Sequence, residues 1–191
     1  RSRGLGDVYK RQEQLAEVLN KGLAPVYLVS GDDTLLVTEA CDQIVAAAKQ
    51  QGFTERSVHH VETGFSWHGL SQDAASMSLF AERKILDVRV ASKKLDKEAS
   101  ALLREWVADG SSNPDTVLLL RTDRLQPKQR SSAWFKALEK DGVVVLIWPL
   151  SAQEFPRWLQ GRLQRKGLDL QTDALSYLAA RVEGNLLAAV Q

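Results

Sequence analysis

The chain has 191 residues, of which 44% are hydrophobic, and this length suffices for one ordinary core and a small second unit. Its 25 lysines and arginines nearly balance 24 aspartates and glutamates, so a net charge of +1 argues against a dedicated nucleic-acid binder with a basic surface throughout. The single cysteine, Cys41, excludes a disulfide scaffold and a thiolate metal site, and it is compatible with a reducing, cytoplasmic compartment.

The N-terminal residues differ in pattern from the rest of the chain. Residues 1–12 carry no hydrophobic period and lack an initiator methionine, so we expect a disordered or non-native tail there. Glu13 to Lys21 has the apolar spacing of an amphipathic helix, and Pro25 to Ser30 is a compact apolar strand. A glycine turn then leads into a helix that extends to about Gln51 and buries Cys41. This order predicts a βα unit.

Four more strands are predicted along the chain. Arg56 to Val61 is polar enough to lie near a sheet edge, and Lys84 to Val90 is a third strand. Thr116 to Leu120 and Val143 to Trp148 are continuous apolar runs, which are typical of strands covered on both faces.

Helical patterns separate these strands. Ser66 to Ala75 and Ser132 to Lys140 each have one apolar side, and a long helix between them is marked by Leu95, Ala99, Leu102, Leu103, Trp106 and Val107. Five strands separated by helices predict a three-layer α/β domain over residues 13–149 with a largely parallel five-stranded sheet.

After Pro149 the pattern becomes helical. Ser151 to Glu154 has the spacing of a capping box, but Pro156 fits better as the first residue of a helix, because proline lacks the N–H that would be unpaired there. Thr172 begins a second helix, and Asn185 begins a third that has no stop signal. We therefore expect residues 150–191 to be a partial helical lid and the chain to be a fragment. An α/β domain followed by such a lid is the order of AAA+ ATPases, an analogy of fold alone.

That analogy requires a phosphate-binding loop after the first strand. The segment from Ser30 to Thr34 has one glycine, no lysine and two carboxylates, which would repel a polyphosphate at the helix N-terminus. Asp87 lies within the third strand and not at its end, and Leu187 lies near where an arginine would have to reach a γ-phosphate. The sequence predicts an AAA+-like scaffold without a nucleotide site and without a cofactor.

An apolar segment, Ala75 to Phe80, comes after the helix that begins at Ser66. Met77, Leu79 and Phe80 do not share one helical face, so we expect an irregular segment that presents them together. Such a cluster fills a pocket in the chain's own core or in a partner, and the pattern alone favours the core.

The ordered set of segments resembles the delta-subunit family of bacterial DNA polymerase III, which supplies the clamp-opening subunit of the clamp loader. The segments are PVYLVSGDDTLLVTEA from Pro25, SMSLFAERK from Ser76, SAWFKALE from Ser132, FPRWLQGRLQRKGLDL from Phe155 and EGNLLAAVQ from Glu183. The resemblance covers Glu13 to Gln191 and implies an AAA+-like fold whose C-terminal collar domain is absent from this chain.

The resemblance also implies a function. The family member is a subunit without catalysis of its own in a nucleotidyltransferase holoenzyme, a DNA-directed DNA polymerase. It binds and opens the sliding clamp, the beta subunit, for loading on primed DNA. Its other partners are the gamma/tau and delta prime subunits of the loader.

A hydrophobic plug on the first domain carries clamp binding in this family. By position, the anchors are Leu79 and Phe80, Met77 lies beside them, and Ser76 and Ser78 supply backbone and hydroxyl contacts. Clamp-binding peptides often begin with glutamine, where this sequence has Ala75. Burying a leucine and a phenylalanine contributes roughly 1.5–3 kcal/mol each, whereas micromolar binding needs about 8 kcal/mol, so more of the surface must touch the clamp.

Other interpretations remain open. Asp32 and Asp33 after the first strand fit a receiver-type signalling domain, but that class needs an acceptor aspartate ending the third strand and a lysine after the fifth. A role in capping the next helix is another explanation for Asp32 and Asp33 at this position. A degenerate ATPase scaffold in another complex is a further alternative.

Histidines and basic residues complete the candidates. His59, His60 and His68 lack the spacing of a metal site. Two basic clusters either contact DNA or form solvated faces: Lys93, Lys94 and Lys97, and Arg121, Arg124, Lys128 and Arg130. No apolar run reaches about 18 residues, and no signal-peptide pattern occurs, so we expect no membrane association.

Overall fold

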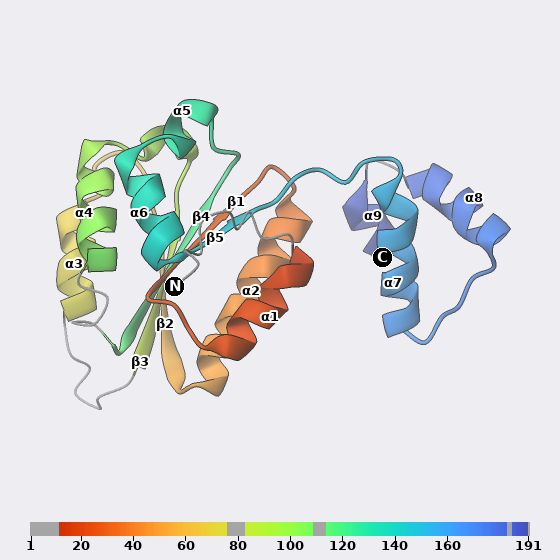
Figure 1. Cartoon of the computed structure of the whole chain (residues 1–191), viewed down its shortest axis with the longest axis horizontal. Coiled ribbons are helices and arrows are strands. Elements are labelled where there is room, and N and C mark those ends of the chain that lie inside the picture. The colour runs from red at the N-terminus through yellow and green to blue at the C-terminus, as the bar shows by residue number, and fades with distance from the viewer. Residues whose placement is uncertain (1–11, 76–82, 109–113, 183–184, 191) are drawn as a thin grey trace, which may run out of the picture. The chain divides into compact units, whose positions relative to one another are not determined.

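The computed structural model describes residues 12–75, 83–108, 114–182 and 185–190 (Figure 1). The chain divides into two compact units between Ile147 and Trp148, close to the boundary expected after Pro149. The first unit is an α/β domain and the second is helical.

A single sheet forms the centre of the first unit. Its strands are β1 (Val26–Ser30), β2 (Phe53–His60), β3 (Arg83–Arg89), β4 (Thr116–Thr122) and β5 (Val143–Leu146), in the order β2-β3-β4-β1-β5. Every neighbouring pair is parallel. The predicted five-stranded α/β fold is therefore confirmed, and its sheet is parallel throughout.

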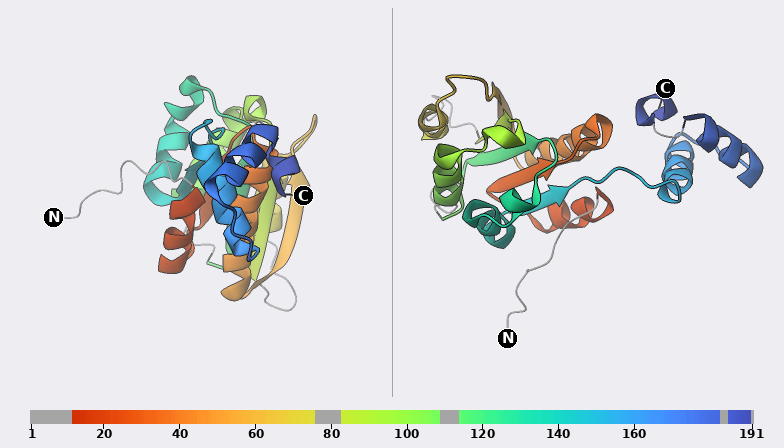
Figure 2. Two further views of the ribbon diagram at one scale, coloured as in Figure 1. Left: turned by 90° about the vertical axis from the view of Figure 1, so that its right-hand side faces the viewer. Right: turned by 90° about the horizontal axis from the view of Figure 1, so that it is seen from above.

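Helices cover both faces of this sheet (Figures 1 and 2). One face carries α1 (Gln12–Lys21) and α2 (Thr34–Gln50), and the other carries α3 (Trp67–Ala75), α4 (Lys97–Ala108) and α6 (Ala133–Asp141). β1 and β4 are apolar and buried along most of their length because both of their faces are covered. The core on the side of α3, α4 and α6 includes Leu28, Leu86, Leu118, Leu120, Leu103, Trp106, Trp134 and Phe135.

Several element boundaries differ from those expected. β2 begins at Phe53 and not at Arg56, although its mostly exposed side chains and terminal place agree with an edge strand. α1 already includes Gln12, which the sequence pattern places in the tail. Two short helical turns come after β3 and β4, η1 (Ser92–Lys94) and α5 (Pro127–Arg130), and α5 was not expected.

The second unit contains α7 (Glu154–Arg165), α8 (Thr172–Val182) and α9 (Leu186–Val190). The expectation that Pro156 begins α7 is wrong, because the helix begins at Glu154. Ser151 and Glu154 exchange hydrogen bonds, with the Glu154 carboxylate accepting from the Ser151 N–H at 3.0 Å and the Ser151 hydroxyl accepting from the Glu154 N–H at 3.3 Å. Pro156 still lies in the first turn, where a missing N–H leaves no hydrogen bond unmade.

Candidate functional site

The residues expected to bind the clamp, Ser76, Met77, Ser78, Leu79 and Phe80, lie outside the described residues. The structure describes the elements that flank them. α3 ends at Ala75 on one side, and β3 begins at Arg83 on the other.

A buried lysine connects these two flanks. The ammonium group of Lys84 donates a hydrogen bond to the backbone carbonyl of Asp73, within the last turn of α3. Lys84 Nζ also lies 3.8 Å from Asp73 Oδ1, and His59 Nε2 of β2 lies 3.2 Å from Asp73 Oδ2. Asp73 is therefore in contact with β2 and β3, and the sequence pattern gives no sign of this arrangement.

Arg83 fixes the start of β3 to its surroundings. Its Nε donates to Asp115 Oδ1 at 3.0 Å, its Nη1 donates to the Gln51 carbonyl at 3.1 Å, and its guanidinium lies 5.5 Å from the centre of the Phe53 ring. A pocket of about 230 Å³ adjoins this residue, lined by Leu23, Ala24, Pro25, Gln51, Phe53, Arg83, Pro114, Thr116 and Val117. The C-terminal flank of segment 76–82 is thus bonded to three parts of the fold.

The turn between β1 and α2, where the AAA+ analogy requires a phosphate-binding loop, is closely packed with groups of the chain itself. Asp33 Oδ1 accepts a hydrogen bond from the Leu36 N–H at 2.9 Å, which confirms that Asp33 caps α2. Asp32 Oδ1 accepts from the Arg124 N–H at 3.1 Å. Gly31 packs against Ile147 so closely that a Cβ at position 31 would lie 2.6 Å from the Ile147 Cβ. A carboxylate of the chain itself therefore takes the place at the α2 N-terminus that would receive an anion.

Asp87 lies in the middle of β3 and is completely buried. Arg121 of β4 holds both of its oxygens, with Nε 2.8 Å from Oδ1 and Nη2 2.9 Å from Oδ2. Arg56 of β2 adds a contact of 2.5 Å from Nη2 to Oδ2. Arg121 does not belong to a basic surface cluster as the sequence suggests, because its side chain is only 11% exposed and points into this ion cluster. A carboxylate so enclosed is not placed to accept a phosphoryl group as a receiver domain requires.

The loops after β3 and β4 are joined by hydrogen bonds. Asp123 Oδ1 accepts from the Ser92 N–H, and Gln129 Nε2 donates to the Ser92 carbonyl at 2.5 Å. Burial alone would raise the pKa of the Asp123 carboxyl group, but hydrogen bonds from Ser92 and Thr122 outweigh it and lower that pKa. The Ser30 hydroxyl donates to the Asp123 carbonyl at 2.9 Å, which ties the pair of loops to β1.

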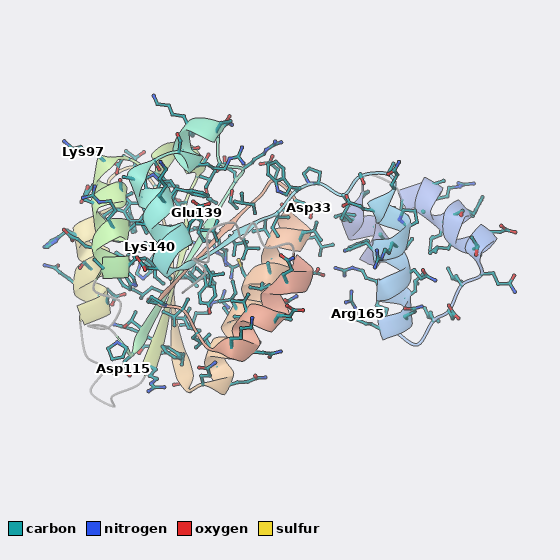
Figure 3. The ribbon with its side chains drawn as sticks, in the orientation of Figure 1. Asp33, Lys97, Asp115, Glu139, Lys140 and Arg165 are labelled. Carbon is teal, nitrogen blue, oxygen red and sulfur yellow. The ribbon has the colours of Figure 1, made fainter. Side chains whose placement is uncertain are left out.

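This joined pair of loops carries most of the predicted basic clusters at the carboxyl ends of the strands. Lys93, Lys97 and Lys128 are exposed, and Arg124 belongs to the same edge. Asp33 and Lys97 lie toward the upper end of the first unit in Figure 3, whereas Asp115 lies at its lower end. The basic loops and the flanks of segment 76–82 are therefore at opposite edges of the sheet.

No group of three or more histidine, cysteine, aspartate or glutamate side chains that could hold a metal ion occurs among the described residues. Within the same residues, every helix is too short or too polar to cross a membrane.

Comparison with known proteins gives concordant matches. The family model for the delta subunit of DNA polymerase III matches residues 27–147. DNA polymerase III subunit delta of Escherichia coli K12 is 32% identical over 181 residues, covering 94% of this chain and 52% of that protein. The Haemophilus influenzae protein of the same name is 32% identical over 184 residues, with the same coverage of both. The chain thus spans about half the length of these relatives.

Solved structures agree at the level of fold. The Bacillus subtilis DNA clamp loader delta protein has a TM-score of 0.69 at 22% identity, over 95% of this chain and 55% of that one. A Thermotoga maritima RuvB structure has a TM-score of 0.55 at 16% identity, over 100% of this chain and 62% of that one. Because the family model covers most of the α/β unit and more than half of the sequence, the chain belongs to the delta-subunit family of DNA polymerase III.

Proposed function

We propose that this chain carries the clamp-binding part of a DNA polymerase III delta subunit and has no catalysis of its own. The observation that carries the proposal is the family match over residues 27–147, which covers most of the α/β unit and includes the segment with Leu79 and Phe80. The partner is the sliding clamp, and the setting is chromosome replication in the bacterial cytoplasm. Residues 150–191 belong in this proposal to the helical lid domain.

The proposed action is a shift of population. The subunit binds one clamp protomer near the protomer interface and prefers the geometry of the open ring, so binding raises the open fraction. ATP acts on the partner gamma/tau subunits and controls access to this surface. The carboxylate of Asp33 at the α2 N-terminus supports that division of labour, because an anion-binding position is already filled.

Clamp binding by the Leu79→Ala, Phe80→Ala double variant tests the proposal. Loss of both side chains removes about 3–6 kcal/mol of favourable free energy from apolar burial in the complex. Binding to immobilised beta clamp, measured by surface plasmon resonance, should therefore weaken by roughly 100-fold or more. A matched control removes one leucine and one aromatic ring elsewhere, Leu168→Ala with Tyr177→Ala, whose side chains are 54% and 64% exposed in the second unit.

The two possible failures have different meanings. A folded double variant that still binds the clamp refutes the assignment of the plug. A double variant that cannot fold shows that Leu79 and Phe80 belong to the chain's own core.

Contact with primed DNA is a second candidate function, favoured by the hydrogen bonds that hold the two basic loops together. Neutralising Lys93, Lys97 and Lys128 in the assembled loader should reduce the steepness with which the association constant for primed DNA falls with salt. The slope of log K against the logarithm of the salt concentration should become smaller in magnitude by about 2–3. An unchanged slope would mean that these lysines form a solvated face.

A further inference from the structure

Helix α7 carries most of the positive charge of the second unit. Three arginines lie within the helix and a lysine follows it directly: Arg157, Arg162, Arg165 and Lys166. The one acid of α7, Glu154, lies in the first turn and accepts hydrogen bonds from the Ser151 N–H at 3.0 Å and the Ser151 hydroxyl at 2.8 Å. The helix therefore has an excess of positive charge.

Two of these arginines lie in one row along α7 with a glycine between them. Arg157, Gly161 and Arg165 are four positions apart from one another, so they follow the same side of the helix. Both arginines are exposed, and within the described part of the chain neither forms a hydrogen bond or an ion pair. A Cβ at position 161 would meet no atom within 4 Å, so the surface between the arginines is open. We call these three residues the α7 row.

Helix stability accounts for only one member of the α7 row. Arg165 lies in the last turn, where the helix dipole favours a cation, but Arg157 is among the first four residues, where the dipole disfavours one. Gly161 is less favourable than alanine inside a helix, and no neighbouring atom of the described residues requires it. Glycine is favoured where another molecule approaches the backbone closely. Two of the three residues thus point to a ligand.

A further cation is held beside the α7 row. Arg162 precedes Arg165 by three positions, so their side chains are neighbours on the helix surface. The guanidinium of Arg162 lies 4.3 Å from the centre of the Trp158 ring, and that ring stacks on Phe155 with the ring centres 5.6 Å apart. The aromatic pair therefore holds this charge in place next to the row.

We propose that the α7 row binds the phosphate backbone of a DNA strand. Guanidinium groups match phosphate oxygens in pairs, and the gap at Gly161 leaves room for a continuous polymer. The row from Arg157 to Arg165 extends about 12 Å, over which one strand of DNA carries roughly three or four phosphates. The surface belongs to the second unit, so this inference goes beyond clamp binding and beyond the basic loops of the first unit.

The test removes the charges of the α7 row from the full chain. Arg157→Gln combined with Arg165→Gln should weaken the binding of a fluorescent oligothymidylate about tenfold in anisotropy titrations at low salt. Because two phosphate contacts are lost, the slope of log K against the logarithm of the salt concentration should become smaller in magnitude by about 1.4. Arg157→Lys combined with Arg165→Lys keeps both charges and should retain the wild-type slope.

A matched control removes two exposed cations from the first unit. Arg104→Gln combined with Lys136→Gln changes the net charge by the same amount on α4 and α6. This control should bind the oligothymidylate as the wild type does.

Position 161 provides an independent pair of variants. Gly161→Glu places a carboxylate between the two arginines and should abolish binding, whereas Gly161→Gln adds a similar bulk without charge and should weaken binding less. Both variants should melt at or above the temperature of the wild type, because glutamate and glutamine favour a helix more than glycine does. Loss of binding by folded Gly161→Glu therefore does not come from unfolding.

NMR spectra of the isotope-labelled chain locate the surface. Oligothymidylate should shift the backbone amide signals of residues 157–166, and shifts confined to the first unit overturn the inference. It is also overturned if the wild-type chain does not bind, if the folded Arg157→Gln, Arg165→Gln variant binds equally well, or if polyglutamate of equal charge competes as strongly as DNA. Clamp binding is measured separately, so none of these results decides the proposed function.

Discussion

The buried Asp87 shows how single residues fix the pairing of three strands. Its carboxylate is shared by Arg56 and Arg121, which lie 31 and 34 positions away in the sequence on the two neighbouring strands. A charge buried without such partners would be strongly unfavourable, so the cluster selects this arrangement of β2, β3 and β4 over others.

Replacing Asp87 should therefore destabilise the fold. Asp87→Asn leaves the two guanidinium groups without a counter-charge and should lower the free energy of unfolding by about 3 kcal/mol in urea titrations. Asp115→Asn is the matched control, because Asp115 pairs with Arg83 at the surface with 65% of its side chain exposed, and a change below about 1 kcal/mol is expected. Equal effects of the two variants would contradict a special role for the buried cluster.

Cys41 should be inert in the folded chain. Burial, reinforced by the nearby carboxylates of Asp87 and Asp42, raises the pKa of its thiol to about 12, despite the opposing effect of Arg121 and Arg56. The reactive thiolate is consequently scarce at neutral pH. An aromatic disulfide reagent that releases a coloured thiolate on reaction should detect the Cys41 thiol only after denaturant is added. Rapid reaction of the native chain would contradict the burial of Cys41.

Residue roles were predictable from sequence where the contact is local. Asp33 caps the helix that begins one residue later, so its role can be inferred from the sequence around it. The roles of Arg121 and Lys84 were missed because their partners lie on other elements, and no sequence period relates a strand residue to a helix carbonyl across a connecting segment. The plug therefore stays a prediction from family resemblance, and the contacts of its two flanks are visible only in the structure.

At the scale of elements, the turn between β1 and α2 is defined by close packing. Gly31 leaves room for Ile147, the residue that ends the first unit, and the Ile147 N–H donates to the Ser30 carbonyl at 2.7 Å. The glycine that resembles part of a phosphate loop thus serves here as a contact between the first and last strands of the unit.

Gly31→Ala should therefore destabilise the unit. The added Cβ would lie 2.6 Å from the Ile147 Cβ and 2.8 Å from its carbonyl oxygen, so the ends of the strands must shift. This shift should lower the free energy of unfolding by about 2–3 kcal/mol, measured by chemical denaturation. Gly161→Ala is a control of opposite sign, since an added Cβ in α7 meets no atom within 4 Å and should stabilise the helix by up to about 1 kcal/mol. A neutral Gly31→Ala would contradict the packing argument.

Element types were predictable where the hydrophobic period is strong. Two strands, β1 and β4, are continuous apolar runs, and two helices, α2 and α4, each have one apolar face with helical spacing. The start of α7 was misplaced because two local signals compete within six residues, and the reciprocal bonds of Ser151 and Glu154 outweigh the preference of Pro156 for the first position. The short α5 carries too few residues for any period to appear.

At the scale of the whole molecule, the chain combines an AAA+-type fold with an aspartate cap at the N-terminus of α2. Alternation of strands and helices predicted the parallel sheet, but not its order β2-β3-β4-β1-β5, because the pairing partners of β1 depend on contacts between distant segments. The fold resembles that of the Thermotoga maritima RuvB structure, whereas the chemistry of the turn after β1 depends on a few side chains.

Magnesium ATP should therefore leave the stability of the chain unchanged. A ligand present at 100 times its dissociation constant stabilises a protein by about 2.7 kcal/mol, which is readily detected as a rise in melting temperature. Differential scanning fluorimetry with millimolar Mg-ATP should show no such rise. A dose-dependent rise that disappears on adding a chelator would refute the proposal that the α2 N-terminus no longer serves ATP.

The position of β1 between β4 and β5 also affects how a nascent chain matures. Val26 pairs with Leu118, and Tyr27 pairs with Val143, so β1 finds no neighbour until most of the first unit has been translated. During that interval a largely apolar strand stays open to solvent while β2 and β3 can already associate. The pairing of β1 therefore has to wait for strands that are synthesised long after it, and an apolar strand left unpaired for that time favours aggregation of the nascent chain.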